Sequence, residues 1–204
     1  MATLKFEGKT FIENNVFAQV INMDGVDALK VIKDPKIIPV DENTFARLID
    51  TDFKDGIIEV KLLSRLLPDA PDFARGFLGI AFRINADNSA FESVYIRPTN
   101  GRAPVQLRRN RSTQYFSYPD YKFDRFRAES PEMYESYADM GLNEWIDYKL
   151  VVKGETAQLY LNHSKYPVLM VNDLKHGSTT QGSIGLWTEV GSEAYFRDLK
   201  ITHF

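Results

Sequence analysis

The sequence predicts an all-β protein built as a two-sheet antiparallel β-sandwich. Apolar and polar residues alternate along many short segments, and Gly, Asn and Asp lie between those segments. No window of 12 residues shows the apolar stripe of an amphipathic helix. A chain of 204 residues fits one sandwich or barrel. We therefore expect a single domain over residues 1–204.

The alternation is clearest in four segments, at 56–63, 76–84, 145–154 and 182–190. Every second residue in them is apolar, which is typical of a strand with one buried face. Together with the segment 91–98, they predict a core that includes Leu78, Ile80, Phe82, Val94, Ile96, Leu150, Val152, Ile184 and Leu186. The segment 152–162 predicts a hairpin, and 130–145 predicts a short strand and a loop.

Composition excludes several classes of site. The chain has no cysteine, so disulfides, thiolate nucleophiles and cysteine-bound zinc are excluded. The three histidines show no zinc-binding spacing, and we expect no metal site of that kind. The longest apolar runs are too short to span a membrane. The first ten residues lack a signal-peptide core, which favours a cytoplasmic protein as written, or a secreted one if a leader has been removed. Nothing indicates the oligomeric state.

Three sequence motifs resemble a known superfamily. They are "DFKDGIIEVKL" (52–62), "ARGFLGIAFRI" (74–84) and "GSIGLWTEVGSEAYFRDLKIT" (182–202). They are similar to strands of the concanavalin A-like lectin/glucanase superfamily, including its laminin-G-like jelly-roll domains. The resemblance covers about residues 4–204 and implies two stacked sheets, one of them concave. The superfamily includes lectins, β-glucanases, sugar-binding modules and protein-binding domains, so it does not by itself define a function.

The paired carboxylates of laminarinase-type glucanases are absent. Those enzymes carry an "E-x-D-x-x-E" or "E-x-D-x-E" strand, because one carboxylate acts as the nucleophile and one as the acid. The nearest runs here, "DGIIE" (55–59) and "EVGSE" (189–193), do not match. This counts against laminarinase chemistry. A different glycoside hydrolase could use Glu135 or Glu189 as its acid.

One stretch, residues 95–127, is strongly basic in a chain of net charge −3. It holds seven arginines and Lys122 against Asp120 and Asp124, eight positive charges less two negative, or +6. Strand parity there places one set of side chains away from the core: Tyr95, Arg97, Gln106, Arg108, Arg125 and Arg127. Trp187 and Glu189 share that outward parity. If the segments are consecutive neighbouring strands, these residues form one face of a sheet.

Such a face suits a saccharide. Arginine presents a planar fork to carboxylate or sulfate, and tyrosine and tryptophan offer flat faces to sugar rings. We therefore predict a carbohydrate-interacting domain, for acidic saccharides, with Tyr95, Arg97, Gln106, Arg108, Arg125, Arg127 and Trp187 as ligand-binding residues. The alternatives are a glycoside hydrolase of non-laminarinase type and a laminin-G-like protein-interaction domain.

Two structural alternatives stay open. The arginines could instead pair with carboxylates nearby in the sequence, at Glu92, Glu129, Glu132 and Glu135. The acidic loops 85–88 and 171–177 could bind calcium through oxygen atoms, although turn formation explains them equally well. No other cofactor is indicated. Nucleic acid is not an expected partner, because the isoelectric point is about 5.7.

Overall fold

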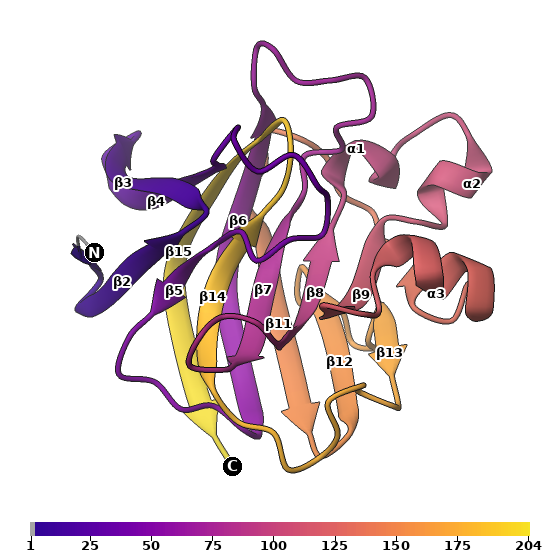
Figure 1. Cartoon of the computed structure of the whole chain (residues 1–204). Coiled ribbons are helices and arrows are strands. Elements are labelled where there is room, and N and C mark those ends of the chain that lie inside the picture. Colours follow the sequence, from indigo (N-terminus) through magenta and orange to yellow (C-terminus); the bar gives the residue numbers. More distant parts are fainter. Residues whose placement is uncertain (1–2) are drawn as a thin grey trace.

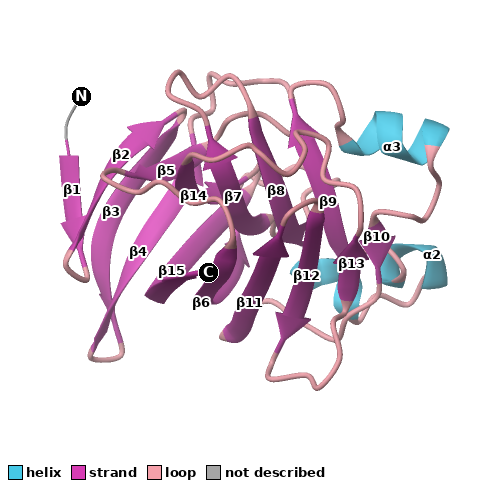
Figure 2. Cartoon of the chain, turned by 90° about the horizontal axis from the view of Figure 1, so that it is seen from below, coloured by secondary structure: helices cyan, strands magenta, loops and turns pink. Residues whose placement is uncertain are grey.

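The computed structural model describes residues 3–204, which form two β-sheets packed face to face (Figures 1 and 2). The eight-stranded sheet has the order β1 (Thr3–Phe6), β2 (Lys9–Asn14), β5 (Phe45–Leu48), β14 (Ser183–Thr188), β7 (Leu78–Ile84), β8 (Phe91–Ile96), β9 (Thr113–Tyr118) and β10 (Glu135–Ser136). The seven-stranded sheet has the order β13 (Leu169–Val171), β12 (Thr156–Leu161), β11 (Ile146–Lys153), β6 (Gly56–Leu66), β15 (Ser192–His203), β4 (Val26–Lys33) and β3 (Val16–Met23). The pairings are antiparallel, so the predicted two-sheet sandwich is confirmed.

The main core lies between the two sheets. All nine residues predicted for it are buried, with at most 1% of each exposed. On β6, the same period of two buries Ile58, Val60 and Leu62. The predicted hairpin is formed by β11 and β12, and the predicted short strand in 130–145 is β10. Alternation predicted these elements well because each has one face on an apolar interior.

A second, aromatic core covers the outer face of the eight-stranded sheet. Its members are Phe45, Ala81, Ile84, Phe91, Tyr95, Phe116 and Trp187. The ring centroids of Tyr95 and Trp187 lie 4.7 Å apart. The loop 34–44 crosses this face in Figure 1, and the Trp187 indole Nε1 donates to the Glu42 carbonyl at 2.9 Å. The outward parity predicted for Tyr95 and Trp187 is therefore right, but loops cover both side chains and neither is open to solvent.

Two segments that the sequence suggested were strands are helices. Residues Gln106–Arg109 form α2 and Phe123–Glu129 form α3, after the short α1 at Pro98–Gly101. Alternation over three or four residues fits one helical turn as well as a strand. In α3, Arg125 Nε also pairs with Glu129 Oε1 at 2.9 Å, an i,i+4 contact that supports a helix. Gln106, Arg108, Arg125 and Arg127 are thus carried by helices, so the argument from consecutive strands was wrong for them.

Helices α1, α2 and α3 gather near the end of the eight-stranded sheet that β8, β9 and β10 form. In Figure 1, α1, α2 and α3 lie beside β8 and β9. In residues 3–204, no helix has the length and apolar character that crossing a membrane requires.

Candidate functional site: an arginine cleft

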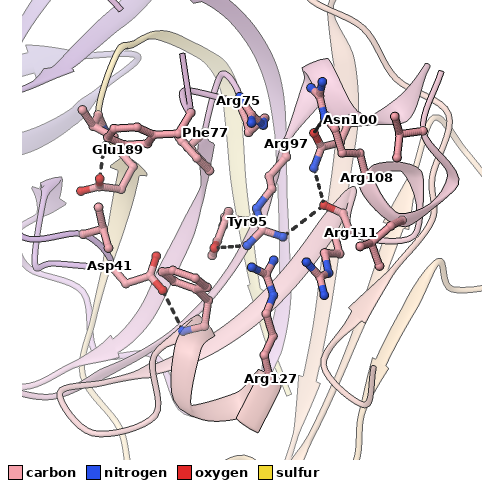
Figure 3. Close-up of a pocket in the computed structure, with 16 residues that line it drawn as sticks. Asp41, Arg75, Phe77, Tyr95, Arg97, Asn100, Arg108, Arg111, Arg127 and Glu189 are labelled. Atoms are coloured by element: carbon pink, nitrogen blue, oxygen red, sulfur yellow. Dashed lines mark hydrogen bonds between the residues drawn. The ribbon is translucent and has the colours of Figure 1, made fainter. Parts of the chain in front are cut away.

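A cleft of about 310 Å³ opens where the helices meet the outer face of the eight-stranded sheet (Figure 3). Tyr95, near the end of β8, contributes to its lining. The other lining residues come from the loops 34–44 and 67–77, the turn after β14, and the segment that runs from Arg97 to α3. We name it the arginine cleft after five lining residues, Arg75, Arg97, Arg108, Arg111 and Arg127.

Glu135 holds three of these arginines. Its Oε1 accepts from Arg97 Nη1 at 2.9 Å and from Arg127 Nη2 at 2.5 Å, and Arg111 Nε lies 3.6 Å from Oε2. The Glu135 side chain is only 6% exposed. Burial alone would raise the pKa of Glu135, but the hydrogen bond from Arg127 and the three guanidinium charges outweigh it and lower the pKa. Glu135 is therefore a fixed anion behind the cleft.

Arg97 is the most constrained arginine of the cleft. Its Nη2 donates to the Tyr95 hydroxyl at 2.6 Å and to Gln114 Oε1 at 2.9 Å. The guanidinium carbon also lies 4.8 Å from the centroid of the Tyr95 ring. Gly79, on the neighbouring β7, makes room for Tyr95, because a Cβ there would lie 2.5 Å from the Tyr95 Cα. These contacts hold the Arg97 guanidinium in one orientation at the cleft.

Arg75 and Arg108 differ from the other arginines of the cleft. Within residues 3–204, neither has a carboxylate oxygen within 4.0 Å. Arg75 Nη1 donates to two carbonyl oxygens of its own loop, both at 2.7 Å, and Arg108 Nε donates to Asn100 Oδ1 at 3.2 Å. Burial, and then the charges of Arg108 and Arg97, lower the pKa of Arg75, although the charge of Asp72 opposes the shift. Two guanidinium groups therefore line the cleft without an ion-pair contact to a carboxylate of residues 3–204.

Two buried carboxylates line the side of the cleft opposite Arg108 (Figure 3). Glu189 is 2% exposed, and both of its oxygens are engaged. Oε1 pairs with Lys33 Nζ in a short contact, and Oε2 accepts from the Val190 amide at 2.9 Å. Burial raises the pKa of Glu189 to about 7 despite the charge of Lys33.

Asp41, the second carboxylate, is 3% exposed and has a free oxygen. Its Oδ2 accepts from the Phe123 amide at 3.0 Å, while Oδ1 accepts no hydrogen bond from the described part of the chain. Burial raises the pKa of Asp41, although the Phe123 bond and the charges of Arg97 and Lys122 oppose the shift. Asp41 can therefore accept a hydrogen bond from a molecule in the cleft.

Apolar side chains complete the lining. Phe77 and Phe123 lie among the charged groups, and Arg127 stacks over the Phe123 ring at 4.9 Å from its centroid. Phe73, Val105 and Leu107 also line the cleft, and more than half of each remains exposed. The arginine cleft thus combines cations, flat rings and aliphatic groups.

The structure brings together part of the predicted site. Four of the seven predicted ligand-binding residues line the cleft, namely Tyr95, Arg97, Arg108 and Arg127. Gln106 does not, and its Nε2 donates to Asn110 Oδ1 at 2.7 Å on the exposed side of α2. Arg125 pairs with Glu129 away from the cleft, and Trp187 lies in the aromatic core. Ligand binding by these three residues stays a prediction from the sequence alone, and the cleft does not include them.

The ion-pair alternative explains only some of the arginines. Glu135 pairs with Arg97 and Arg127, and Glu129 pairs with Arg125. Glu92 is buried elsewhere, where its Oε2 accepts from the Tyr115 hydroxyl at 2.7 Å. These contacts leave Arg108 without a carboxylate and the cleft in place.

Sequence reasoning missed the parts of the cleft that come from loops. Asp41 lies in the loop 34–44 and Arg75 in the loop 67–77, and strand parity says nothing about loop residues. Asn100 and Arg111 lie within the basic stretch, beside the residues that were singled out. The one available signal was the sequence "DFARGF" (72–77), where an arginine stands between two phenylalanines.

The loops considered for calcium show ordinary turn contacts. Asp87 Oδ1 accepts from the Ser89 amide at 3.1 Å, and Asp173 Oδ2 pairs with Lys175 Nζ at 2.6 Å. Among the residues that the structure describes, no three His, Asp or Glu side chains gather as a metal site would require.

Comparison with known proteins identifies the fold. No family model matches the sequence, and no curated protein matches it. Among solved structures, it is similar to the carbohydrate binding module CBM66 from Bacillus subtilis, with 13% identity and a TM-score of 0.56 over 93% of this chain and 96% of that one.

Two further structures have the same general fold. A protein of unknown function with a galectin-like fold from Bacillus subtilis has 15% identity and a TM-score of 0.54 over 92% of this chain and 86% of that one. A putative glycosyl hydrolase from Parabacteroides distasonis has 11% identity and a TM-score of 0.51 over 91% and 83%. Identities this low establish the shared β-sandwich only.

Proposed function

We propose that this protein binds acidic saccharides in the arginine cleft. The observation that carries the proposal is the pair Arg75 and Arg108, two guanidinium groups that line a cleft and have no carboxylate partner in residues 3–204. A guanidinium fork binds a carboxylate or sulfate through two parallel N–H donors. An anionic group on the ligand would supply the direct ion-pair contact that Arg75 and Arg108 lack.

The charge balance of the cleft favours an anion. The lining holds five arginines and the carboxylates of Asp41 and Glu189, so five positive charges less two negative leave +3. The raised pKa values of Asp41 and Glu189 can only increase this excess. In a partly enclosed cleft such an excess concentrates anions.

Other groups of the cleft suit a saccharide. The free Oδ1 of Asp41 can accept a hydrogen bond from a sugar hydroxyl. The exposed ring of Phe73 can pack on the C–H side of a sugar ring, and Phe77 and Phe123 add apolar surface to the cleft. The fold shared with a carbohydrate binding module supports a saccharide ligand by analogy.

The geometry favours binding over glycoside hydrolysis. Glu135 has a lowered pKa and three arginine neighbours, so it is a poor proton donor. Glu189 has the raised pKa of an acid, but both of its oxygens are already engaged. Asp41 is then the one carboxylate of the cleft with a free oxygen, and hydrolysis of this kind requires two carboxyl groups.

Calorimetry with oligosaccharides that carry uronate or sulfate groups tests the proposal, with neutral oligosaccharides as a control. We expect Arg108→Ala to weaken binding about 10- to 150-fold, the equivalent of about 1.5–3 kcal/mol for a charge-assisted contact. Arg108→Lys should not restore binding, because an ammonium lacks the planar fork. Affinity should also fall as salt rises.

The matched control is Arg125→Ala. Arg125 lies on α3 in the same basic stretch, but it does not line the cleft and it pairs with Glu129. The Arg125→Ala variant should bind acidic oligosaccharides with the same affinity as the parent protein. Equal binding by the parent and the Arg108→Ala variant, or preference for neutral oligosaccharides, would refute the proposal. Chromatography of the oligosaccharides after incubation would reveal any cleavage.

A further inference from the structure

The rim of the arginine cleft exposes three large apolar side chains. Phe73 is 56% exposed, Val105 is 52% exposed and Leu107 is 53% exposed. They come from separate segments, since Phe73 lies in the loop 67–77, and Val105 and Leu107 lie at the start of α2. All three nevertheless line the same cleft as Arg75 and Arg108.

This grouping distinguishes them from other exposed apolar residues. Single exposed apolar side chains are normal on any protein surface and need no explanation. Met133, at 61% exposed, and Tyr166, at 70% exposed, are of that kind and do not line the arginine cleft. Apolar side chains that gather beside charged groups in a concave site are typical of ligand recognition.

The aliphatic part of the rim is poorly explained by a sugar ring alone. Sugar rings pack well on flat aromatic faces, which the exposed Phe73 supplies. Val105 and Leu107 are branched and present no flat face. They suit a methyl, acyl or alkyl group, which gains free energy when its surface leaves water.

The anion-binding and apolar groups also lie close together. Leu107 and Arg108 are neighbours on a single helical turn, and the Arg108 amide donates to the Val105 carbonyl at 3.1 Å. One ligand can therefore contact the charge and the apolar rim at once, provided that its apolar group lies within a few bonds of its anionic group.

We infer that the natural ligand of the arginine cleft is an anionic saccharide that carries an apolar substituent, such as an alkyl, acyl or lipid group. The inference rests on the proposed function and narrows its ligand class. The anionic group binds at Arg75 and Arg108, and the substituent packs on Val105 and Leu107. Charge complementarity and the rim together favour this amphiphile over a saccharide that is polar throughout.

A pair of synthetic ligands tests the inference by calorimetry. The probes are methyl β-glucuronide and hexyl β-glucuronide, which share the anionic sugar and differ only in the alkyl chain. Each methylene that becomes buried should raise affinity up to about four-fold. We expect the parent protein to bind the hexyl glycoside at least about 10-fold more tightly than the methyl glycoside.

Variants then show where the preference arises. Leu107→Ser should lower the affinity for the hexyl glycoside at least about three-fold more than the affinity for the methyl glycoside. Val105→Thr, which keeps the side-chain shape, should act in the same direction. Arg108→Ala should weaken both ligands by a similar factor. Met133→Ser, on an exposed residue outside the cleft, should change neither.

The outcomes separate the two proposals. Equal binding of the two glycosides by the parent protein would overturn the inference and leave the proposed function standing. A preference for the hexyl glycoside that survives both rim variants would also overturn it, because the alkyl chain would then bind elsewhere. Binding of neither glycoside, combined with binding of a short peptide that has adjacent Leu and Glu residues, would overturn both proposals and favour a protein partner.

Discussion

Replacing Glu135 with Gln is expected to destabilise the fold by about 3 kcal/mol, far more than the same change at Glu129. Glu135 is 6% exposed and neutralises Arg97, which is itself buried. Breaking a buried ion pair by removing one partner costs about 3–5 kcal/mol. Gln keeps the shape and one acceptor oxygen, and Arg97 keeps its bonds to Tyr95 and Gln114, so we expect the lower end of that range.

The assay is urea unfolding at pH 7. With a slope of about 2 kcal/mol per molar urea, a loss of about 3 kcal/mol lowers the midpoint by about 1.5 M. Glu129→Gln is the matched control, because Glu129 and Arg125 form an exposed i,i+4 pair with 54% and 40% of their side chains accessible. Such pairs contribute about 0.3–0.5 kcal/mol.

The pH dependence gives a second test of the same interaction. The pKa of Glu135 is lower in the folded protein than its usual 4.5, so the unfolded chain binds its proton first as pH falls. The stabilisation by Glu135 is present above about pH 4.5 and is lost as pH falls through the folded pKa. The difference between the parent and Glu135→Gln should therefore shrink in acid. Equal midpoints for Glu135→Gln and Glu129→Gln at pH 7 would refute the reasoning.

Three further predictions concern stability. The pKa of Glu189 is raised from 4.5 to about 7, so the free energy of unfolding of the parent protein should fall as pH rises from about 4.5 to 7. Urea titrations of Glu189→Gln should show a smaller fall over the same pH range. This substitution also removes the carboxylate partner of Lys33. Arg83→Lys should lower the free energy of unfolding in urea by about 3 kcal/mol, because the fully buried guanidinium donates to three loop carbonyls at 2.8–3.0 Å. The control is Arg65→Lys at an exposed position, which should lower the free energy of unfolding by less than about 0.5 kcal/mol. Leu150→Ala should lower the free energy of unfolding by about 2–5 kcal/mol, and a smaller loss would mean that the core collapses into the cavity.

The sequence predicted the sandwich because apolar residues recur at every second position along its strands. Residues such as Ile80 and Leu186 alternate with others on strands of six or seven residues, long enough for a period of two to be distinguished from a helical period. The outer face was harder to predict. Tyr95 and Trp187 have the parity of surface residues, and only the loop 34–44 makes them a second core, which alternation cannot reveal.

The site was predicted in part, and for partly wrong reasons. Charge and composition identified the basic stretch, and Arg97 and Arg127 do meet in space. They meet, however, through Glu135 on the edge strand β10, and Arg127 comes from a helix. Arg75 comes from a loop about 20 residues earlier than the stretch, and its approach depends on tertiary packing between segments with no sequence pattern in common.

The arrangement of the arginines argues for a ligand more strongly than their number does. A network that served stability alone would give each guanidinium a carboxylate, and the chain has 28 acidic residues against 25 basic ones. Instead Glu135 is shared by three arginines, while burial, and then the charges of Arg108 and Arg97, lower the pKa of Arg75 more than the charge of Asp72 raises it. Like charges held together oppose folding, and sites that bind ligands commonly carry such a cost. An anion between Arg75 and Arg108 would remove that repulsion, which is why we place the acidic group of the ligand there.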